Sequence, residues 1–370
     1  MAVPRFSRRW LLVAAGAAAV AGSQVLPRPV GPVPDRPPED LRALLLAAST
    51  GPYTGLAEST GRLGLPPLPR LETAVALVTS TTRIRAFVAS PDRFRVDEPL
   101  PAGERGTYRR DGREYTWDHG FDQLTEVRAD AALRLPRAAD LLPPALARRL
   151  LRLAPADPVT ALPPRRVAGR DAAGLRLVPA DPATTVARVD VWADATSGLP
   201  LRVEVAGRTD PAVPLLVTEF TEVDERAPDE RLLYPRVPSG GGFVRSDTDA
   251  ITGALRELGA PPPPERLAGR DRVLLGGPEL PGVGLYGTGL AGFVLIPVSR
   301  DIADRAVDGA AAAGGTAVEA GRGRAVRYAT PLLTLAALAR GRRGALLVGT
   351  VGPDELDRAL GELPDRRRPA

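Results

Sequence analysis

Short segments in which apolar residues alternate with Arg, Asp or Glu recur along this chain. They occupy residues 78–90, 93–97, 174–178, 187–194 and 201–205. In a strand, successive side chains point to opposite faces, so a period of two predicts a strand with one dry face and one wet face. The pattern therefore predicts a sheet that buries one side only.

The turns and connections between these segments define the predicted sheet. Asp111-Gly112 provides the two positive-φ positions of a tight hairpin turn, and Thr196-Ser197-Gly198 is a second turn sequence. Strands extend from Tyr53 to about Val127 and from Arg165 to Val223. The connections are too short for helical crossovers, so we predict about 9–11 strands in an antiparallel sheet.

Helical spacing of leucines predicts the elements that cover this sheet. One helix opens at Pro37 and Pro38, places Leu41, Leu44 and Leu45 on one face and ends near Gly51. One or two short helices between Ala138 and Leu153 lie across the sheet. The predicted fold class is α+β: a strongly curved antiparallel half-barrel with covering helices, followed by a smaller α+β domain.

The last hundred residues change character, and the chain divides accordingly. We predict a helix from Asp249 to Leu258 and then strand 292–298, helix 301–313, strand 325–329, helix 331–340, strand 345–351 and helix 354–363. The predicted divisions are an export signal or anchor at 1–26, a Pro-rich linker at 27–38, the half-barrel domain at 39–236, a linker with a short helix at 237–264, the C-terminal domain at 265–364 and a disordered tail at 365–370.

The N-terminus carries the features of an export signal. Arg5, Arg8 and Arg9 precede an apolar stretch, and Ala19-Val20-Ala21 or Ala21-Gly22-Ser23 offers a small-residue cleavage site. Residues 7–12 resemble a twin-arginine motif, and a general secretory signal is the alternative. Either the signal is cleaved or residues 10–26 remain as a membrane anchor. An exported, extracytoplasmic location in the periplasm or cell envelope follows.

Composition excludes several classes of function. The net charge is +5, but all 49 basic residues are arginines, and most alternate with apolar positions on predicted strands. We interpret them as a solvated sheet face, and no nucleic-acid partner is expected. The absence of cysteine excludes disulfides, thiol nucleophiles and zinc–thiolate sites.

No catalytic or metal-binding set emerges from the sequence. His119 is the only histidine, and the chain has no Gly-x-Ser-x-Gly elbow. Residues 282–287 match the dinucleotide fingerprint literally, but no strand precedes them and no helix follows. We therefore predict no enzymatic activity, no cofactor and no metal, and keep an exported hydrolase as an alternative.

The dry face of the sheet is the remaining candidate site. One alternative is that this face forms an ordinary core under the helices. The other is that a strongly curved sheet makes it the wall of a cavity for acyl chains, in which each buried methylene adds about 0.8 kcal/mol to the binding free energy. The candidate lining residues are Ile84, Val88, Phe94, Val96, Trp117, Leu175, Leu177, Val189, Val191, Leu201 and Val203.

Several phrases of the sequence resemble the LolA-like half-barrel superfamily. They are "Pro-Asp-Arg-Phe-Arg" at 91–95, residues 107–117 and "Asp-x-x-Ser-Gly-Leu-Pro-Leu-Arg" at 194–202, within a resemblance that covers about residues 40–236. Residues 284–295 and 345–356 are similar to strands of the C-terminal domain in the two-domain RseB/MucB family of sigma-E regulators. Gly287, Thr288 and Gly352 depart from that family's phrases.

The resemblance implies a non-enzymatic regulator of the cell envelope. Its half-barrel would bind lipid or a lipoprotein acyl chain, and its C-terminal domain would contact a membrane anti-sigma factor, with Tyr286, Gly289 and Leu290 as candidate partner-binding residues. A LolA-like lipoprotein carrier is the main alternative.

Overall fold

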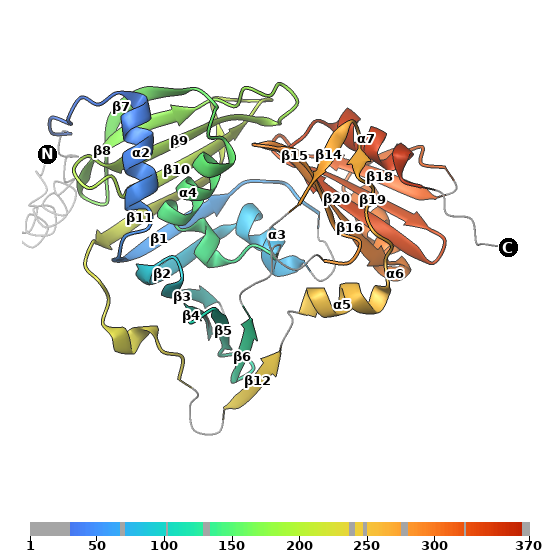
Figure 1. The fold of residues 1–370 in the computed structure, drawn as a ribbon, viewed down its shortest axis with the longest axis horizontal. Coiled ribbons are helices and arrows are strands. Elements are labelled where there is room, and N and C mark those ends of the chain that lie inside the picture. Colours follow the sequence, from blue (N-terminus) through green and yellow to red (C-terminus); the bar gives the residue numbers. More distant parts are fainter. Residues whose placement is uncertain are drawn as a thin grey trace, which may run out of the picture. The chain divides into compact units, whose positions relative to one another are not determined.

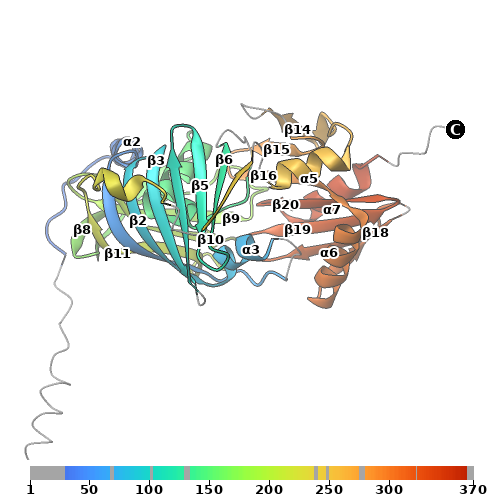
Figure 2. The same cartoon turned by 90° about the horizontal axis from the view of Figure 1, so that it is seen from below.

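A curved sheet of twelve strands organises the first domain, residues 38–246. In the computed structural model its strands follow the order β12-β6-β5-β4-β3-β2-β1-β11-β10-β9-β8-β7 (Figure 1). The structure describes residues 30–66, 71–100, 103–128, 134–236, 241–246, 250–274, 280–321 and 323–364. The sheet is unclosed, and Figure 2 shows its strands following one another around the curve. The predicted fold class, with its curved sheet, is therefore confirmed.

The strands of this sheet are β1 (Tyr53–Gly61), β2 (Thr81–Ser90), β3 (Arg93–Leu100), β4 (Gly103–Arg110), β5 (Arg113–Asp118), β6 (Gln123–Arg128), β7 (Val159–Val167), β8 (Arg170–Leu177), β9 (Val186–Asp194), β10 (Pro200–Gly207), β11 (Pro214–Asp224) and β12 (Gly242–Ser246). The helices of this domain are α2 (Pro38–Ala48), α3 (Glu72–Thr79) and α4 (Pro143–Leu153), with 3-10 turns η1 (Ala138–Leu141) and η2 (Glu230–Leu233).

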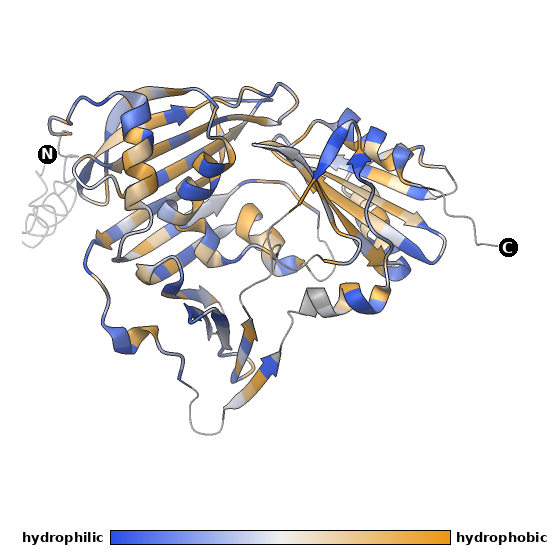
Figure 3. Cartoon of the chain, viewed as in Figure 1, coloured by the Kyte–Doolittle hydropathy of each residue, from blue (hydrophilic) through white to orange (hydrophobic). Residues whose placement is uncertain are grey.

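The dry face predicted from the alternation is the main core of the domain. α2 and α4 lie across one face of the sheet, and hydrophobic residues recur along both the helices and the strands beneath them (Figure 3). Leu45 and Leu151 from the helices are 1% exposed, and Leu175 and Val203 from the strands are fully buried. Removal of this apolar surface from water stabilises the sheet's curvature around the two helices.

The wet face carries arginines in ion pairs, some within one strand and some between neighbouring strands. Arg176 Nε lies 2.7 Å from Asp190 Oδ1, and Arg202 Nε lies 2.8 Å from Glu204 Oε1. Arg188 pairs with Asp190 as well. Asp190 is 1% exposed. Because each buried carboxylate has guanidinium partners, these arginines act within the sheet, as expected for a solvated sheet face.

Both predicted turns form, and one of them explains a phrase of the sequence. Asp111 and Gly112 have φ values of 52° and 70° between β4 and β5. Asp194 Oδ1 accepts hydrogen bonds from the backbone N–H groups of Thr196 and Ser197, both at 2.9 Å. Gly198 then takes φ 77°, and a Cβ atom there would lie 2.4 Å from Leu44 Cγ on α2. The Asp-x-x-Ser-Gly phrase therefore builds the turn on which α2 docks.

The second domain, residues 250–364, contains an eight-stranded sheet with helices on both faces. Its strand order is β13-β14-β15-β16-β20-β19-β18-β17. Its elements are α5 (Ala250–Leu258), β13 (Arg266–Leu267), β14 (Arg270–Val273), β15 (Gly284–Thr288), β16 (Ala291–Ser299), α6 (Arg300–Ala312), β17 (Thr316–Val318), β18 (Arg324–Ala329), β19 (Thr334–Arg340), β20 (Arg343–Gly349) and α7 (Pro353–Glu362).

The predicted helix at 331–340 is wrong, because this segment forms the central strand β19. Its residues from Thr334 to Ala339 are all buried, since α6 covers one face of the sheet and α7 the other. A strand that is covered on both faces is apolar at nearly every position. Its run of Leu and Ala therefore shows no alternation of apolar and polar residues. The helix propensity of Leu and Ala favoured the wrong element.

Two further elements differ from the prediction in the first domain. Residues 72–79 form helix α3 within a region predicted to contain only strands, and the missing Cβ of Gly61 lets the backbone of Val78 lie against β1. Strand β12 pairs parallel to β6, from Gly242–Gln123 to Ser246–Val127, so the sheet is not wholly antiparallel. β12 lies inside the predicted linker 237–264, where its flanking glycines and polar residues indicated a loop.

Candidate functional site

The predicted lining residues divide between the buried core and a small pocket. Nine of them, Ile84, Val88, Val96, Leu175, Leu177, Val189, Val191, Leu201 and Val203, are at most 5% exposed and belong to one hydrophobic cluster with α2 and α4. Phe94 packs against this cluster and is partly buried. Most of the dry face is therefore filled by side chains from the covering helices.

Trp117 lies on the other face of the sheet. Val96 on the inner face pairs with Thr107, and Thr107 pairs with Thr116. Trp117 is the next residue along β5, so its side chain points outward, where it packs with Tyr108 and Leu124. The sequence did not reveal this, because the alternation of β5 contains tyrosine, threonine and tryptophan in place of aliphatic residues.

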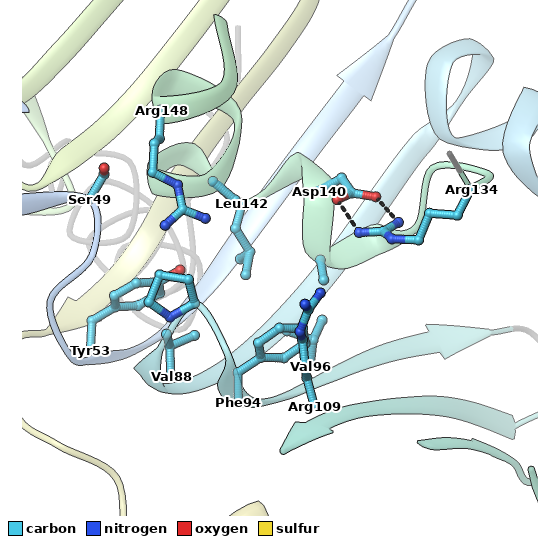
Figure 4. Close-up of a pocket in the computed structure, with 13 residues that line it drawn as sticks. Ser49, Tyr53, Val88, Phe94, Val96, Arg109, Arg134, Asp140, Leu142 and Arg148 are labelled. Atoms are coloured by element: carbon cyan, nitrogen blue, oxygen red, sulfur yellow. Dashed lines mark hydrogen bonds and ion pairs between the residues drawn. The ribbon is translucent and has the colours of Figure 1, made fainter. Parts of the chain in front are cut away.

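A pocket of about 110 Å³ lies between the inner face of the sheet and the η1–α4 segment. Val88, Phe94 and Val96 form part of its apolar side, and they are the predicted lining residues that reach it (Figure 4). Leu142 from the start of α4 faces them. The pocket is smaller than ordinary ligand sites, which span about 300–1,000 Å³.

Three arginines line this pocket, and they differ in their partners. Arg148 extends from α4 toward Tyr53 and Leu142, and Arg109 lies beside Phe94 (Figure 4). Arg109 Nη2 lies 3.2 Å from Asp92 Oδ1, while its Nε is buried without a hydrogen-bond partner. Within the described ranges no carboxylate forms an ion pair with Arg148. The sequence did not single out these residues, since arginine is common everywhere in the chain.

The third arginine is neutralised by a carboxylate on its own segment. Arg134 donates to both oxygens of Asp140 at 2.7 Å. Burial opposes the charge on Asp140, but its bonds from Arg134 and from the Arg137 N–H hold the pKa of Asp140 below its usual range. This bidentate pair fixes the loop that leads into η1.

Burial changes the proton affinity of two other groups in the pocket. It lowers the pKa of Arg148, and the nearby positive charge of Arg152 acts in the same direction. Burial raises the pKa of Tyr53, although the positive charge of Arg148 opposes this shift. Arg148 thus holds a positive charge in a partly desolvated position, where an anion would interact favourably with it.

The candidate partner-binding residues have structural contacts of their own. Tyr286 is fully buried, stacks on Phe293 with ring centroids 5.2 Å apart, and donates from its hydroxyl to the Pro264 carbonyl oxygen at 2.7 Å. Burial raises the pKa of Tyr286 to about 12. Gly289 is exposed in the β15–β16 turn with φ 63°, and Leu290 packs into the core cluster of the first domain. Partner binding by these residues stays a prediction.

A hydrogen-bonded junction joins the two domains and was not predicted from the sequence. Thr184, in the β8–β9 connection, is 1% exposed, and its hydroxyl donates to the carbonyl oxygens of Leu290 and Thr350. The Thr185 N–H donates to the Thr350 carbonyl at 2.9 Å, and Thr184 forms an isolated bridge with Val351. A Thr-Thr pair after a Pro-rich loop was the only sequence signal, and it is not specific.

The remaining sequence motifs lie in turns and strands. His119 lies in the β5–β6 turn, where its ring meets Trp117 edge-on at 5.6 Å. Residues 282–287 form a turn and β15, followed by β16 and not by a helix. Among the described residues, no group of three His, Asp or Glu side chains is placed to hold a metal ion.

Part of the first domain matches a known protein family. Residues 118–233 match the family model of the MucB/RseB N-terminal domain. The predicted resemblance to the MucB/RseB family is confirmed. The matched segment runs from the end of β5 to η2 and includes α4 and the six strands from β6 to β11 of the curved sheet. No curated protein sequence matches the chain.

The solved structures that the chain matches include MucB and a protein of the LolA superfamily. A Pseudomonas aeruginosa MucA/MucB complex is 20% identical, covers 87% of this chain and 96% of its own, and has a TM-score of 0.45. A LolA superfamily protein from Nitrosomonas europaea is 10% identical over 54% of this chain and 99% of its own, with a TM-score of 0.25. LprF from Mycobacterium bovis is 10% identical over 57% and 100%, with a TM-score of 0.31.

The predicted export signal, its twin-arginine motif and its cleavage sites lie outside the described residues, as does the predicted tail at 365–370. None of the helices in the described part of the chain combines the length and the hydrophobicity that a membrane-spanning helix needs.

Proposed function

We propose that this protein is an exported, non-enzymatic regulator of the cell envelope. Its first domain binds lipid or a lipoprotein acyl chain, and its second domain contacts a membrane anti-sigma factor. The MucB/RseB match at residues 118–233 supports this assignment. MucB itself has been crystallised in complex with the periplasmic part of MucA, and a partner of the same kind is proposed here.

The observation that carries the proposal is the combination of an apolar wall and a cation in one pocket. Val88, Phe94 and Val96 offer an apolar surface, and Arg148 offers a positive charge on the opposite side. An anionic amphiphile matches both features, because it has an apolar chain and a negatively charged headgroup. Its headgroup would lie against Arg148 and Arg109, and its chain would follow the three apolar residues.

The pocket must widen to accept an acyl chain, because about 110 Å³ is too small for one. The η1–α4 segment is the part that would move, since it provides one whole side of the pocket. Asp140 belongs to η1, and its ion pair with Arg134 in the preceding loop would move with the segment. The hydrogen bond from Thr218 Oγ1 on β11 to the Leu141 carbonyl, at 2.6 Å, would break.

Such a movement would reach the second domain through the end of α4. A Cβ atom on Gly289 would lie 3.5 Å from the Leu153 carbonyl oxygen, so the β15–β16 turn adjoins the last residue of α4. Leu290 beside it packs into the first domain's core. A shift of α4 would therefore alter this contact, and a coupling free energy of about 1–3 kcal/mol between lipid and partner is typical of such linkage.

Lipid binding is tested by titrating the purified full chain with dansylated undecanoic acid and displacing the probe with dodecanoate. We expect saturable fluorescence enhancement that Phe94→Asp abolishes, because the carboxylate would lie in the apolar wall. Leu56→Asp is the matched control, as Leu56 is an exposed hydrophobic residue on the same sheet. Equal binding by Phe94→Asp and the unsubstituted protein would contradict the assigned pocket.

Regulation is tested by co-purification with the membrane fraction of the native host, followed by identification of the captured protein. A regulator should capture an anti-sigma factor, and addition of dodecanoate should change the amount captured. Capture that is independent of lipid would contradict the proposed coupling.

A LolA-like carrier is the second candidate, and one observation favours it. Every residue that lines the pocket belongs to the first domain, so binding and release of a lipid need no residue of the second. A carrier should transfer a labelled acyl chain to acceptor membranes, whereas a regulator should retain the lipid while its partner is bound.

A further inference from the structure

A groove of about 700 Å³ in the second domain is far larger than the pocket of the first. It lies between the segment Pro261–Pro264, which follows α5, and the turn that joins β19 to β20. Leu295 and Leu338 form its floor, and Leu363 closes the end beside α7. The volume lies within the range of about 300–1,000 Å³ that ligand sites occupy.

The charge on this groove has one sign. Its lining contains Arg340, Arg342 and Arg343 and no carboxylate. Arg342 and Arg343 are exposed at the β19–β20 turn, and neither forms an ion pair within the part of the chain that the structure describes. Arg340 donates to the Leu363 carbonyl at 3.0 Å and holds the end of α7 at the rim. Arg300 nearby already pairs with Asp304.

These features select one kind of occupant. The floor strand β16 pairs with β15 and β20, so its backbone is not available for an added strand. The lining has no aromatic side chain, which recognition of a Pro-rich ligand requires. Apolar side chains on the floor and two exposed guanidinium groups at the rim instead suit a segment that carries both apolar and acidic residues.

We propose that this groove binds an extended segment of a partner protein in which acidic and apolar residues alternate. The apolar side chains lie on Leu295 and Leu338, and the carboxylates pair with Arg342 and Arg343. The inference rests on the partner contact of the proposed function and specifies the chemistry of the partner. It does not depend on lipid binding in the first domain.

The test measures fluorescence anisotropy of labelled peptides with the full chain. The probes are a nonapeptide of sequence Gly-Asp-Leu-Asp-Leu-Asp-Leu-Asp-Gly and its counterpart with Lys in place of Asp. We expect the acidic peptide to bind at least tenfold more tightly, and the difference to shrink as salt screens the charges. The doubly substituted Arg342→Glu/Arg343→Glu protein should lose at least tenfold in affinity, and Arg342→Lys/Arg343→Lys should retain binding.

Two controls locate the effect in the groove. Arg226→Glu changes an arginine side chain that is 87% exposed in the first domain, and it should leave peptide affinity unchanged. Pro364→Trp places a fluorophore at the end of the groove, in a domain whose sequence contains no other tryptophan. Its emission should change when the acidic peptide is added.

Equal affinity for the two peptides would overturn the proposal, as would a folded Arg342→Glu/Arg343→Glu protein that binds normally. A dimer that sedimentation detects and that this double substitution dissociates would also overturn it, because a second copy would then be the occupant. Normal binding of dansylated undecanoic acid without peptide binding would remove this inference and leave the lipid part of the proposed function standing.

Discussion

Arg148 should decide whether the pocket of the first domain prefers an anionic lipid. Arg148 extends into this pocket, and burial together with the charge of Arg152 lowers its pKa. We consider Arg148→Met, which keeps an unbranched side chain and removes the charged guanidinium group. The substitution should weaken binding of dodecanoate and leave methyl dodecanoate unaffected, since the ester has no charge to pair with the guanidinium.

The expected magnitude follows from the kind of contact that is lost. Two unit charges 4 Å apart interact by about 4 kcal/mol at the effective dielectric constant near a protein surface, before desolvation is subtracted. A hydrogen bond to a charged group contributes about 1.5–3 kcal/mol net. The affinity for dodecanoate should therefore fall about 10- to 150-fold. The protein itself should not lose stability, because Arg148 has no ion pair to lose within the described residues.

The assay is displacement of dansylated undecanoic acid at pH 7, combined with urea denaturation of each variant. Arg149→Met is the matched control, since Arg149 is exposed on the same helix and does not line the pocket. The reasoning is refuted if Arg148→Met binds dodecanoate as tightly as the unsubstituted protein. An equal loss of affinity for the acid and the ester would refute it as well, because the effect would then lie in packing.

Three further predictions concern the scaffold. Gly198→Ala should lower the free energy of unfolding by about 2–4 kcal/mol, since the added Cβ would clash with α2 at a position whose φ is already unfavourable. Gly112→Ala has open space around it and should lower the free energy of unfolding by about 1 kcal/mol. Equal losses of Tm for the two variants would contradict this reasoning. The pKa of Asp140 is lowered in the folded state, so the ionised carboxylate stabilises the fold above its unfolded pKa of about 3.9. This stabilisation is lost as the pH falls through the folded pKa. In urea titrations, Asp140→Asn should therefore destabilise the protein at pH 7 and progressively less toward pH 2. Thr184→Val should lower the free energy of unfolding by about 1–3 kcal/mol and separate the unfolding of the two domains in calorimetry. The control Thr221→Val, at an exposed position, should lower it by under about 0.5 kcal/mol. A single unchanged transition for Thr184→Val would argue against the junction.

Alternation predicted the first domain well because one of its faces is wet. Arg83, Arg85 and Arg202 alternate with buried residues, and this period is visible without any knowledge of the fold. The central strand β19 has no wet face, so its sequence has no alternation and resembles a helix. The sequence is thus most informative where solvent touches one side of an element and least informative where both sides are covered.

The pocket illustrates a second limit of the sequence. Apart from Trp117, the predicted lining residues do face inward, and most of them are buried in the core. Whether an inward side chain lines a space or packs against a leucine depends on where α2 and α4 lie, and long-range packing decides that position. The roles of Arg148 and Arg109 depend on the same placement, so no local pattern could distinguish them from the other arginines.

Strand β12 has a practical consequence for separating the two domains. It belongs by sequence to the stretch between them, but its backbone hydrogen-bonds to β6 and completes the sheet. An excision after residue 236 would strip this strand away and expose the backbone donors and acceptors of β6, which invites self-association. Engineers who want a stable single-domain fragment, or a chimaera with a foreign C-terminal module, should place the cut beyond Ser246.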